Sequence, residues 1–324
     1  MDSTNRFNAK NICVVGGGSW GQNHIKTLFS LKSLAGVVDS DNSVIDSVKK
    51  AYPTCKVFLN IDDALSMNFD GYIIATGPSS HHALAKKIIS RKKDLLIEKP
   101  MTLKTSDAKE LCDLAEKNKV KLMVGHLLLF HPAFNKMKEM CNKGYIGDIQ
   151  YMYSNRLNFG TIRSTENVFW SFAPHDISLF QYFAEDNPKD ISSAGVDILQ
   201  PGIHDSTITT IKYENGIMGH IYVSWIHPFK EHRFVIIGSK GMFYFEDSKK
   251  EKPLLFFSKN INFDGQVPVA EDKSSTEIEY DFQFPLTKQL KYFIACIGGK
   301  NVNVASGQSG LEVINILEKA SSCL

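Results

Sequence analysis

The chain reads Val14-Val15-Gly16-Gly17-Gly18-Ser19-Trp20-Gly21 at the end of a short apolar run. These residues match the pattern G-x-G-x-x-G, and a helical pattern follows them. Gly16 permits a tight turn, Gly18 lets backbone amides approach a pyrophosphate, and Gly21 lets the helix pack closely on the strand. Ser19 and Trp20 begin the helix, whose positive N-terminus favours an anion. The stretch predicts a dinucleotide-binding loop and a doubly wound α/β fold around it.

An acidic residue follows at the end of the next predicted strand. Asp39 lies 21 residues after Gly18 (39 − 18), close to the spacing of about 20 residues for the acid that binds a ribose 2′-hydroxyl. Its charge repels a 2′-phosphate, and Asp39-Ser40-Asp41 offers no arginine to neutralise one. We therefore expect NAD rather than NADP, although Lys49 and Lys50 are near enough in sequence to fold back. The alternative is a structural turn followed by a solvated aspartate.

The first 126 residues alternate between short apolar runs and helical patterns. Runs this short, without polar alternation, are typical of parallel strands covered on both faces. Strands are expected at residues 11–15, 34–38, near 57, 71–75, 95–97 and 122–124, and helices at 19–31, 42–51, 62–66, 81–91 and 106–118. This order predicts an α/β Rossmann domain over residues 1–126 that binds the dinucleotide.

The pattern changes after residue 126. Two hairpins are predicted, because Glu214-Asn215-Gly216 and Gly238-Ser239-Lys240-Gly241 each separate a pair of strand-like runs, and Asn-Gly is a strong hairpin signal. Helices are expected at 132–142, 286–296 and 309–320, further strands at 254–257 and 277–282, and a loop over 259–275. Residues 127–324 are therefore predicted to form an α+β domain with an open, mostly antiparallel sheet that holds the substrate.

Composition limits the class of protein. The chain has 324 residues, of which 43% are apolar and 22% charged, and its formal net charge is +2. It contains no basic stripe suited to a phosphate backbone and no apolar run of the ~20 residues that cross a membrane. We therefore expect no binding to nucleic acid or membranes. The N-terminus lacks a signal-peptide core and the six cysteines are scattered, which predicts buried free thiols in a reducing cytoplasm.

A metal site is not expected. His126 and His131 are five residues apart, which differs from the i, i+4 spacing of a helical zinc pair. The sequence also has no HExxH motif and no CxxC pair.

Two further motifs carry side chains suited to chemistry. Glu98-Lys99-Pro100 ends a predicted strand at the edge where open α/β sheets bind ligands, so Lys99 is placed to hydrogen-bond a substrate hydroxyl or carbonyl. His175 lies in Trp170-Ser171-Phe172-Ala173-Pro174-His175-Asp176, just before a helical pattern over residues 177–183. A histidine near a helix start can reach a cleft, although a lone histidine is more often structural.

Together these motifs resemble the glucose-fructose oxidoreductase / inositol dehydrogenase / MocA family (Gfo/Idh/MocA). The resemblance covers nearly the whole chain and joins the loop 16–21, Ala75-Thr76 with His81, Glu98-Lys99-Pro100, Val124-Gly125-His126 and His175 in order. It implies a Rossmann domain followed by an open sheet that often mediates oligomers, here a tetramer or dimer.

The resemblance also implies roles on the cofactor side. Thr76, His81 and Glu98 join the glycine loop and Asp39 as cofactor contacts. Lys99 is implied to lie where the nicotinamide meets the substrate, and the Lys99–Pro100 peptide bond is often cis in the family.

In the second domain the resemblance makes His175 the general acid/base. Many members carry an aspartate four residues before this histidine, where this chain has Ser171. An Asp–His relay is therefore doubtful here, and His175 is expected to act with Lys99 or with a substrate group.

Within the family, the stretches 155–163 and 170–176 look most like nucleotide-sugar 3-dehydrogenases. Those enzymes oxidise the 3-hydroxyl of UDP-N-acetylglucosamine or its uronic acid ahead of an aminotransferase. Arg156 and Arg163 are candidates for the diphosphate, because a guanidinium grips phosphate with two bonds; surface arginines are equally expected there. The substrate contacts expected on this basis are Lys99, Arg156, Asn158, Arg163, Ser171 and His175.

Three other functions stay open. One is an NAD-dependent dehydrogenase of a free polyol or sugar, as in the inositol enzymes. Another is a non-enzymatic NAD-binding regulator, which the presence of Lys99 and His175 disfavours. The last is a methyltransferase, which also has a glycine-rich loop but gives no account of Glu98-Lys99-Pro100 or His175.

Overall fold

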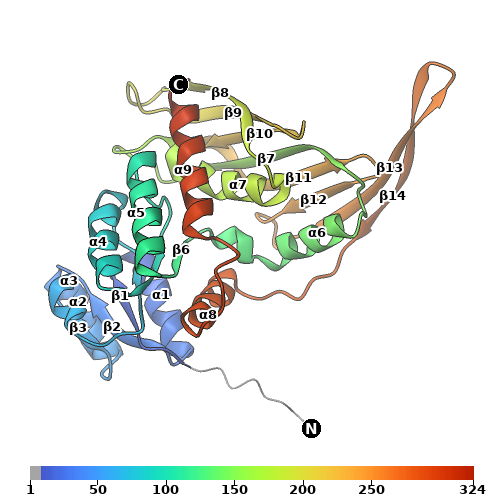
Figure 1. The fold of residues 1–324 in the computed structure, drawn as a ribbon. Coiled ribbons are helices and arrows are strands. Elements are labelled where there is room, and N and C mark those ends of the chain that lie inside the picture. The colour runs from blue at the N-terminus through green and yellow to red at the C-terminus, as the bar shows by residue number, and fades with distance from the viewer. Residues whose placement is uncertain (1–8) are drawn as a thin grey trace, which may run out of the picture. The chain divides into compact units, whose positions relative to one another are not determined.

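A computed structural model describes residues 9–324, except the side chains of residues 259, 260, 262, 263 and 271–274. The chain divides into two compact units. The first comprises residues 1–127 and 284–314, and the second residues 128–283 and 315–324. Figure 1 gives the order of the elements along the chain.

The first unit contains a six-stranded parallel sheet in the order β3-β2-β1-β4-β5-β6. Its strands are β1 (Ile12–Val15), β2 (Leu34–Val38), β3 (Lys56–Phe58), β4 (Gly71–Ile74), β5 (Asp94–Ile97) and β6 (Leu122–Val124). The order reverses between β1 and β4, which is where doubly wound sheets bind dinucleotides. All six predicted strands are present, so the predicted Rossmann fold is confirmed.

Helices connect these strands. They are α1 (Ser19–Ser30), α2 (Asn42–Ala51), α3 (Ile61–Leu65), α4 (Pro78–Ser90) and α5 (Thr105–Asn118). Strands β1 and β4 are buried along their whole length, as expected for apolar runs covered on both faces. Because the strands are parallel, the residues that follow them lie at one edge of the sheet, and the predicted cofactor residues gather there.

The first unit also contains α8 (Pro285–Ile297), which the sequence analysis had grouped with the second domain. The buried face of α8 includes Leu290 and Phe293, and the helix packs against α1. Gly71 of β4 lies against the end of α8, because a Cβ there would lie 2.7 Å from Ile297 Cδ1 and this side chain would have to shift. The boundary predicted after residue 126 falls one residue from the first break, whereas residues 284–314 belong to the first unit.

The second unit contains an eight-stranded sheet in the order β14-β13-β12-β11-β7-β10-β9-β8. Its strands are β7 (Ile149–Phe159), β8 (Pro188–Val196), β9 (Ser206–Tyr213), β10 (Met218–Ser224), β11 (Ile226–Gly238), β12 (Met242–Glu246), β13 (Leu254–Asp264) and β14 (Val267–Glu277). Only β7 and β10 pair in parallel within this sheet. Both predicted hairpins are present, and the predicted open, mostly antiparallel sheet is confirmed.

Two helices, α6 (Pro132–Asn142) and α7 (Val168–Ala184), cover one face of this sheet (Figure 1). Phe134 of α6 packs against Phe234 of β11, and α7 contacts β7, β9 and β10. Along β7 the side chains alternate, so that Met152 and Ser154 are buried under the helices and Tyr151 and Tyr153 lie on the other face. The single turn η1 (Leu127–Phe130) precedes α6, and α9 (Gly307–Ser321) closes the chain.

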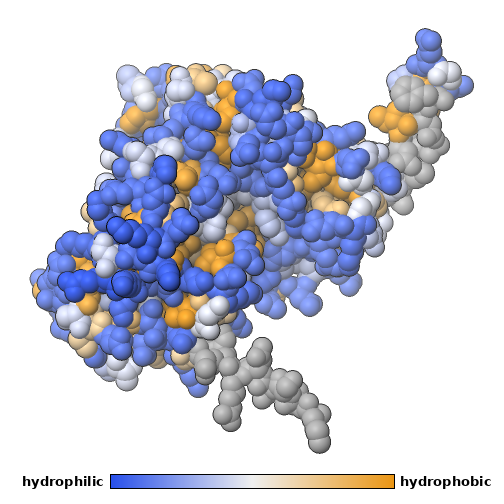
Figure 2. All heavy atoms as spheres, viewed as in Figure 1, coloured by the Kyte–Doolittle hydropathy of each residue, from blue (hydrophilic) through white to orange (hydrophobic). Residues whose placement is uncertain are grey.

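Three expectations for the second unit were wrong, and the third is the strand expected at 277–282, of which only Glu277 lies in a strand, β14. The segment 259–275, predicted as a loop, forms most of the β13–β14 hairpin, which turns at Gly265 with φ +65°. Its backbone pairing leaves apolar side chains such as Ile261 and Val267 exposed, so no apolar period marked it in the sequence. Figure 2 shows apolar surface where this arm leaves the sheet.

The second error concerns α7, which was expected to start near residue 177. It begins at Val168, because the side chain of Asn167 accepts a hydrogen bond from Trp170 N at 3.0 Å and caps the helix. Pro174 lies inside this helix. His175 is therefore in the body of α7 rather than at its start.

Candidate cofactor and catalytic site

The glycine loop has the geometry that the sequence predicted. Gly16 has φ +97°, which glycine adopts readily. A Cβ on Gly21 would lie 2.0 Å from Gly16 O, so α1 packs too closely on the loop to accept a side chain. At Gly18, by contrast, an added Cβ would meet nothing within 4 Å. The loop thus leaves open space over the N-terminus of α1, which fits a pyrophosphate.

Asp39 follows β2 and is tied to this loop. Its Oδ2 accepts a hydrogen bond from Gly17 N at 2.7 Å, and its Oδ1 accepts one from Asp41 N at 2.9 Å. The carboxylate is half-buried and held beside the glycines. This position fits an acid that accepts hydrogen bonds from a ribose, and it opposes a phosphate group on that ribose.

Glu98 follows β5 and carries a buried carboxylate. Its Oε1 lies 2.8 Å from His24 Nε2 of α1, and its Oε2 accepts a weak hydrogen bond from Lys99 N at 3.2 Å. Burial raises the pKa of this carboxyl, but its hydrogen bonds and its proximity to His24 and Trp20 outweigh burial and lower it overall. Glu98 therefore stays ionised in the interior. No local pattern in the sequence indicates a role for His24, because 74 residues separate it from Glu98.

Lys99 follows Glu98 at the same edge of the sheet and is half-buried. The Lys99–Pro100 peptide bond is cis, as the resemblance implied.

His81 and Thr76 lie beside this segment. His81 is fully buried, with Nδ1 2.9 Å from Pro100 O and Nε2 3.0 Å from Thr76 O. Burial lowers the pKa of His81 although both carbonyls favour its charged form. A neutral ring donates to only one of them. His81 thus connects the segment after β4 to the segment after β5. The hydroxyl groups of Thr76 and Ser80 are hydrogen-bonded, with 2.7 Å between Oγ1 and Oγ.

His126 is a residue of this region to which the sequence analysis gave no role. Its side chain is 1% exposed and follows β6. In the described part of the chain, neither ring nitrogen has a hydrogen-bond partner. Burial lowers its pKa to about 4, against the attraction of Glu98. The ring is therefore neutral near pH 7.

In the second unit, His175 lies on α7 one turn after Ser171. Residues four apart lie on the same face of a helix, so these two side chains are neighbours. The carbonyl of His175 accepts a hydrogen bond from Ser178 Oγ at 2.7 Å. The aspartate expected in relatives is absent from position 171, and the nearest acid on the helix, Asp176, is directed elsewhere.

Asp176 forms a buried, two-bond ion pair with Arg156 of β7. The distances are 2.7 Å from Arg156 Nε to Oδ2 and 3.0 Å from Nη2 to Oδ1. Burial alone would lower the pKa of Arg156, but Asp176 outweighs it and raises the pKa. This guanidinium was one of two candidates for the diphosphate, and a surface arginine was equally expected there. Two of its nitrogens donate to Asp176, because a buried charge requires a partner.

The other predicted substrate residues lie in or after β7. Asn158 shares the helix-covered side of β7 with Arg156, and its Oδ1 is buried with no hydrogen-bond partner among the described residues. Arg163 follows the strand, its side chain is 53% exposed, and it pairs loosely with Glu166 at 3.9 Å. Arg163 therefore retains donors for an anion, whereas Arg156 has few.

His232 is a third residue to which no role was assigned from the sequence, after His24 and His126. It lies opposite Arg156 in the pairing of β11 with β7. Burial, assisted by the positive charges of Arg156 and Lys230, lowers its pKa to about 4. The pairing of β11 with β7 places His232 beside Arg156, and no local pattern in the sequence predicted this position.

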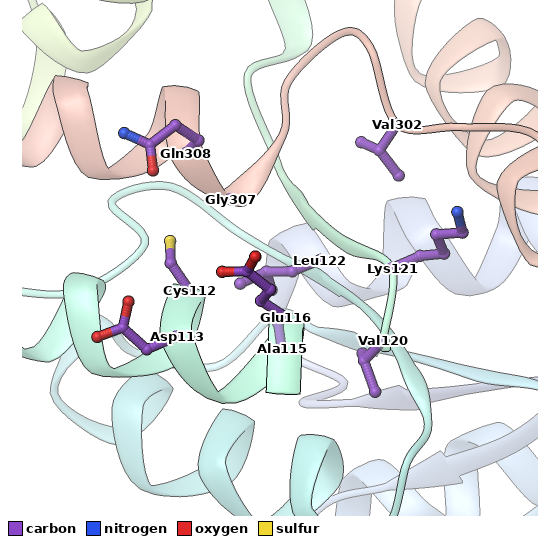
Figure 3. A pocket seen from close by; sticks show the side chains of 10 residues that line it. All are labelled: Cys112, Asp113, Ala115, Glu116, Val120, Lys121, Leu122, Val302, Gly307 and Gln308. Atoms are coloured by element: carbon purple, nitrogen blue, oxygen red, sulfur yellow. The ribbon is translucent and has the colours of Figure 1, made fainter. Parts of the chain in front are cut away.

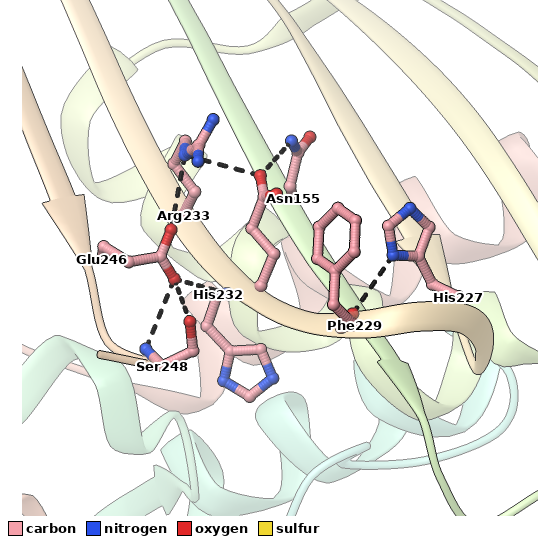
Figure 4. Close-up of polar contacts among 8 residues, drawn as sticks. Asn155, His227, Phe229, His232, Arg233, Glu246 and Ser248 are labelled. Atoms are coloured by element: carbon pink, nitrogen blue, oxygen red, sulfur yellow. Dashed lines mark hydrogen bonds and ion pairs between the residues drawn. The ribbon is translucent and has the colours of Figure 1, made fainter. Parts of the chain in front are cut away.

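A polar network on the other side of β11 fixes this strand (Figure 4). Glu231 Oε1 accepts a hydrogen bond from Asn155 Nδ2 at 2.6 Å and lies 3.4 Å from Arg233 Nε. Glu246 Oε1 accepts from the backbone of His232 at 2.8 Å and from the hydroxyl of Ser248. The network positions the backbone that carries His232.

One pocket of about 300 Å³ lies in the first unit, away from the glycine loop, Asp39 and Glu98 of that unit (Figure 3). It is lined by Cys112, Asp113, Ala115, Glu116, Val120, Lys121, Leu122, Val302, Gly307 and Gln308. These residues surround the start of β6, whereas the glycine loop, Asp39 and Glu98 follow the ends of their strands. The pocket is at the opposite edge of the sheet, so we do not assign it to the cofactor.

Among the side chains that the structure describes, no group of three or more His, Cys, Asp or Glu residues is placed to hold a metal ion. The helices of residues 9–324 are each too short or too polar to cross a membrane.

Family models match both parts of the chain. Residues 10–126 match the model described as "Oxidoreductase family, NAD-binding Rossmann fold", and residues 134–244 match the "GFO/IDH/MocA C-terminal domain". The chain belongs to the Gfo/Idh/MocA oxidoreductase family. It carries the NAD-binding domain of that family, and NAD is its cofactor.

Individual relatives point to more than one substrate. UDP-N-acetylglucosamine 3-dehydrogenase of Acidithiobacillus ferrooxidans is 30% identical over 56% of this chain and 57% of its own length. The solved structure of that enzyme matches this chain with a TM-score of 0.86 at 21% identity. The match covers 98% of this chain and 97% of that chain. The scyllo-inositol 2-dehydrogenase (NAD(+)) of Bacillus subtilis is 24% identical over 60% of each chain. The curated matches thus span little more than half of these relatives.

Proposed function

We propose that this protein is an NAD-dependent dehydrogenase that oxidises the 3-hydroxyl of a UDP-N-acetyl amino sugar, either UDP-N-acetylglucosamine or its uronic acid. The observation that carries the dehydrogenase proposal is the position of Glu98 and Lys99 after β5, at the same sheet edge as the glycine loop and Asp39. The nucleotide-sugar proposal rests on the 30% identical relative.

His175 is proposed as the base that accepts the proton of the sugar hydroxyl. Bound NAD supplies the acceptor for the hydride that leaves the same carbon. Proton transfer by a positioned base contributes about 10²–10⁴-fold to a rate. Lys99 is proposed to stabilise the developing alkoxide with its positive charge.

Substrate binding is proposed to involve Asn158, Arg163 and Ser171 in addition to Lys99 and His175. The free carbonyl oxygen of Asn158 is suited to accept a sugar hydroxyl. Arg163 is the better candidate for the diphosphate, because Arg156 is engaged by Asp176.

A substrate panel tests this proposal. Purified protein and NAD are mixed with UDP-N-acetylglucosamine, its uronic acid, UDP-glucose, and myo- and scyllo-inositol, and NADH formation is followed by absorbance. We expect the highest kcat/KM with one of the two UDP-N-acetyl sugars. Turnover of inositols alone would replace the nucleotide-sugar proposal by the polyol alternative, which the Bacillus subtilis relative favours. NAD binding without turnover of any of these compounds would favour a regulator.

We also propose a homo-oligomer, a dimer or tetramer, formed through the second unit. A 3-keto sugar is a suitable substrate for an aminotransferase, which is proposed to follow this enzyme. The six cysteines are all free, which agrees with the proposed cytoplasmic location.

A further inference from the structure

The Glu98 carboxylate is fixed from three directions. His24 of α1 contacts one oxygen at 2.8 Å, and the backbone of Lys99 contacts the other at 3.2 Å. On the third side lies Gly125, where an added Cβ would come within 2.6 Å of Glu98 Oε2. A group this tightly enclosed cannot rotate away, so its charge stays at one point of the sheet edge.

The carboxylate of Glu98 is ionised in the interior, because the hydrogen bonds to it and its proximity to His24 outweigh burial and lower its pKa. His24 is fully buried beside it, with Nε2 2.8 Å from Oε1. Burial lowers the pKa of His126 to about 4, so this neighbouring ring is neutral near pH 7 and adds no charge.

The carboxylate lies on the half of the sheet that faces the nicotinamide in doubly wound folds. The pyrophosphate binds at the first turn of α1, and the two halves of the dinucleotide extend to either side of the switch point between β1 and β4. Asp39, after β2, marks the adenosine side. Glu98, after β5, lies on the opposite side and interacts with Trp20 in the first turn of α1.

We propose that Glu98, held by His24, is the anion that stabilises the positively charged oxidised nicotinamide relative to the neutral reduced ring, and so sets the redox equilibrium of the bound cofactor. This inference rests on the proposed function in so far as the protein must bind NAD. Glu98 acts through charge and takes no part in the proton or hydride transfer.

Dissociation constants of NAD⁺ and NADH, measured by calorimetry and by NADH fluorescence, test the inference without turnover. Glu98→Gln is isosteric and still accepts the hydrogen bond from His24. A unit charge within about 8 Å changes such a balance by about tenfold or more at an effective dielectric constant of about 20. We therefore expect Kd(NAD⁺)/Kd(NADH) to rise at least about tenfold in Glu98→Gln. A tenfold change corresponds to about 30 mV for a two-electron couple.

A matched control removes a charge from the same unit. Glu110 on α5 pairs with Lys86 and His82 at the surface. Glu110→Gln should leave the ratio of the two constants unchanged. An unchanged ratio in Glu98→Gln, or equal weakening of both dinucleotides, would overturn the inference and make Glu98 a structural residue. Failure of the wild type to bind either dinucleotide would instead overturn the proposed function.

A second variant covers the case in which Glu98→Gln does not fold. His24→Leu removes the donor, so the pKa of Glu98 rises. At low pH the ratio Kd(NAD⁺)/Kd(NADH) of His24→Leu should then resemble that of Glu98→Gln. As pH rises it should return to the wild-type value. The other charged or titratable groups near Glu98 are Lys99, His81 and His126, and they are identical in both proteins. A ratio in His24→Leu that matches the wild type at every pH would contradict the inference.

Discussion

Asp39 illustrates how one carboxylate in this chain can serve two purposes. It accepts hydrogen bonds from Gly17 and Asp41, which hold the glycine loop against the end of β2. The same oxygens retain lone pairs for a ribose. A substitution of Asp39 is therefore expected to affect both the conformation of the glycine loop and the binding of the cofactor.

Replacing Asp39 with Ala should weaken NADH binding about tenfold to a hundredfold, because a charge-assisted hydrogen bond contributes about 1.5–3 kcal/mol. The preference for NADH over NADPH should fall, since repulsion of the 2′-phosphate is lost. Fluorescence titration with both dinucleotides measures this, with Asp46→Ala on the exposed side of α2 as the control. Equal or tighter binding of NADPH by the wild type would refute the role assigned to Asp39.

Lys99→Ala and His175→Ala should bind NADH and melt close to the wild type, but turn over poorly. We expect kcat to fall about 10²–10⁴-fold in His175→Ala, because the loss of a positioned base costs about this much. Stopped-flow or steady-state NADH absorbance gives kcat, and calorimetry gives cofactor affinity. A variant with a near-normal rate would remove that residue from the mechanism.

His126 should make stability depend on pH. Its folded pKa of about 4 lies below the ordinary value of about 6.5, so the unfolded chain binds the proton first as pH falls. The contribution to stability is complete above about pH 6.5 and is lost toward about pH 4, by up to about 3 kcal/mol. In His126→Leu this loss should disappear. Urea unfolding at several pH values measures it, and parallel pH profiles for the two proteins would contradict it.

At the scale of elements, α7 joins the sheet of the second unit to the predicted base. Asp176 ties the helix to Arg156 of β7, while His175 precedes it by one residue in the chain. The ion pair between Asp176 and Arg156 therefore helps to fix the orientation of the adjacent residue, His175. The hairpins of the sheet in turn place His232 beside Arg156.

Asp176→Ala should destabilise the second unit by about 3–5 kcal/mol, because Arg156 would remain buried without its partner. Thermal unfolding measures the change. As a control, Glu214→Ala removes a partner of Lys189 in an exposed pair at 3.7 Å and should cost less than about 1 kcal/mol. Equal melting temperatures of the two variants would show that the buried ion pair stabilises the protein no more than the exposed pair does.

At the scale of the whole molecule, the second sheet offers one face to α6 and α7 and another that the helices leave open. Ile221 and Val223 are fully buried on the helix side, whereas Ile237 and Val235, the latter 6% exposed, alternate onto the other side. On that side Tyr153 stacks on His220 at 5.3 Å between ring centroids. The apolar residues thus divide between two faces, which is the premise of the proposed self-association.

Val235→Asp should dissociate the proposed oligomer and leave NADH bound to the first unit. Burial of a carboxylate without a partner in a packed interface costs free energy. Light scattering at micromolar concentration gives the mass, and NADH fluorescence gives cofactor binding. A monomeric wild type would end the proposal, and loss of cofactor together with association would mean that the two units fold as one.

Local patterns in the sequence were enough to predict the first unit. The short apolar runs, the turn at Gly16 and the acid at Asp39 each depend on neighbours in the chain, so their geometry follows from local rules. The Asn-Gly turn at Gly216 predicted its hairpin for the same reason. The β13–β14 arm was not predicted, because apolar side chains such as Ile261 and Val267 are exposed there and no apolar period marks the segment.

The sequence by itself determined the Rossmann sheet and the glycine turn, and it predicts a pyrophosphate contact at that turn and the roles of Lys99 and His175. Only the tertiary structure decided that Glu98 is paired with His24, that Arg156 is occupied by Asp176, and that α8 belongs with the first unit. The physical reason is burial: a charge or an apolar helix face removed from water must find a partner, and that partner can come from any distance along the chain.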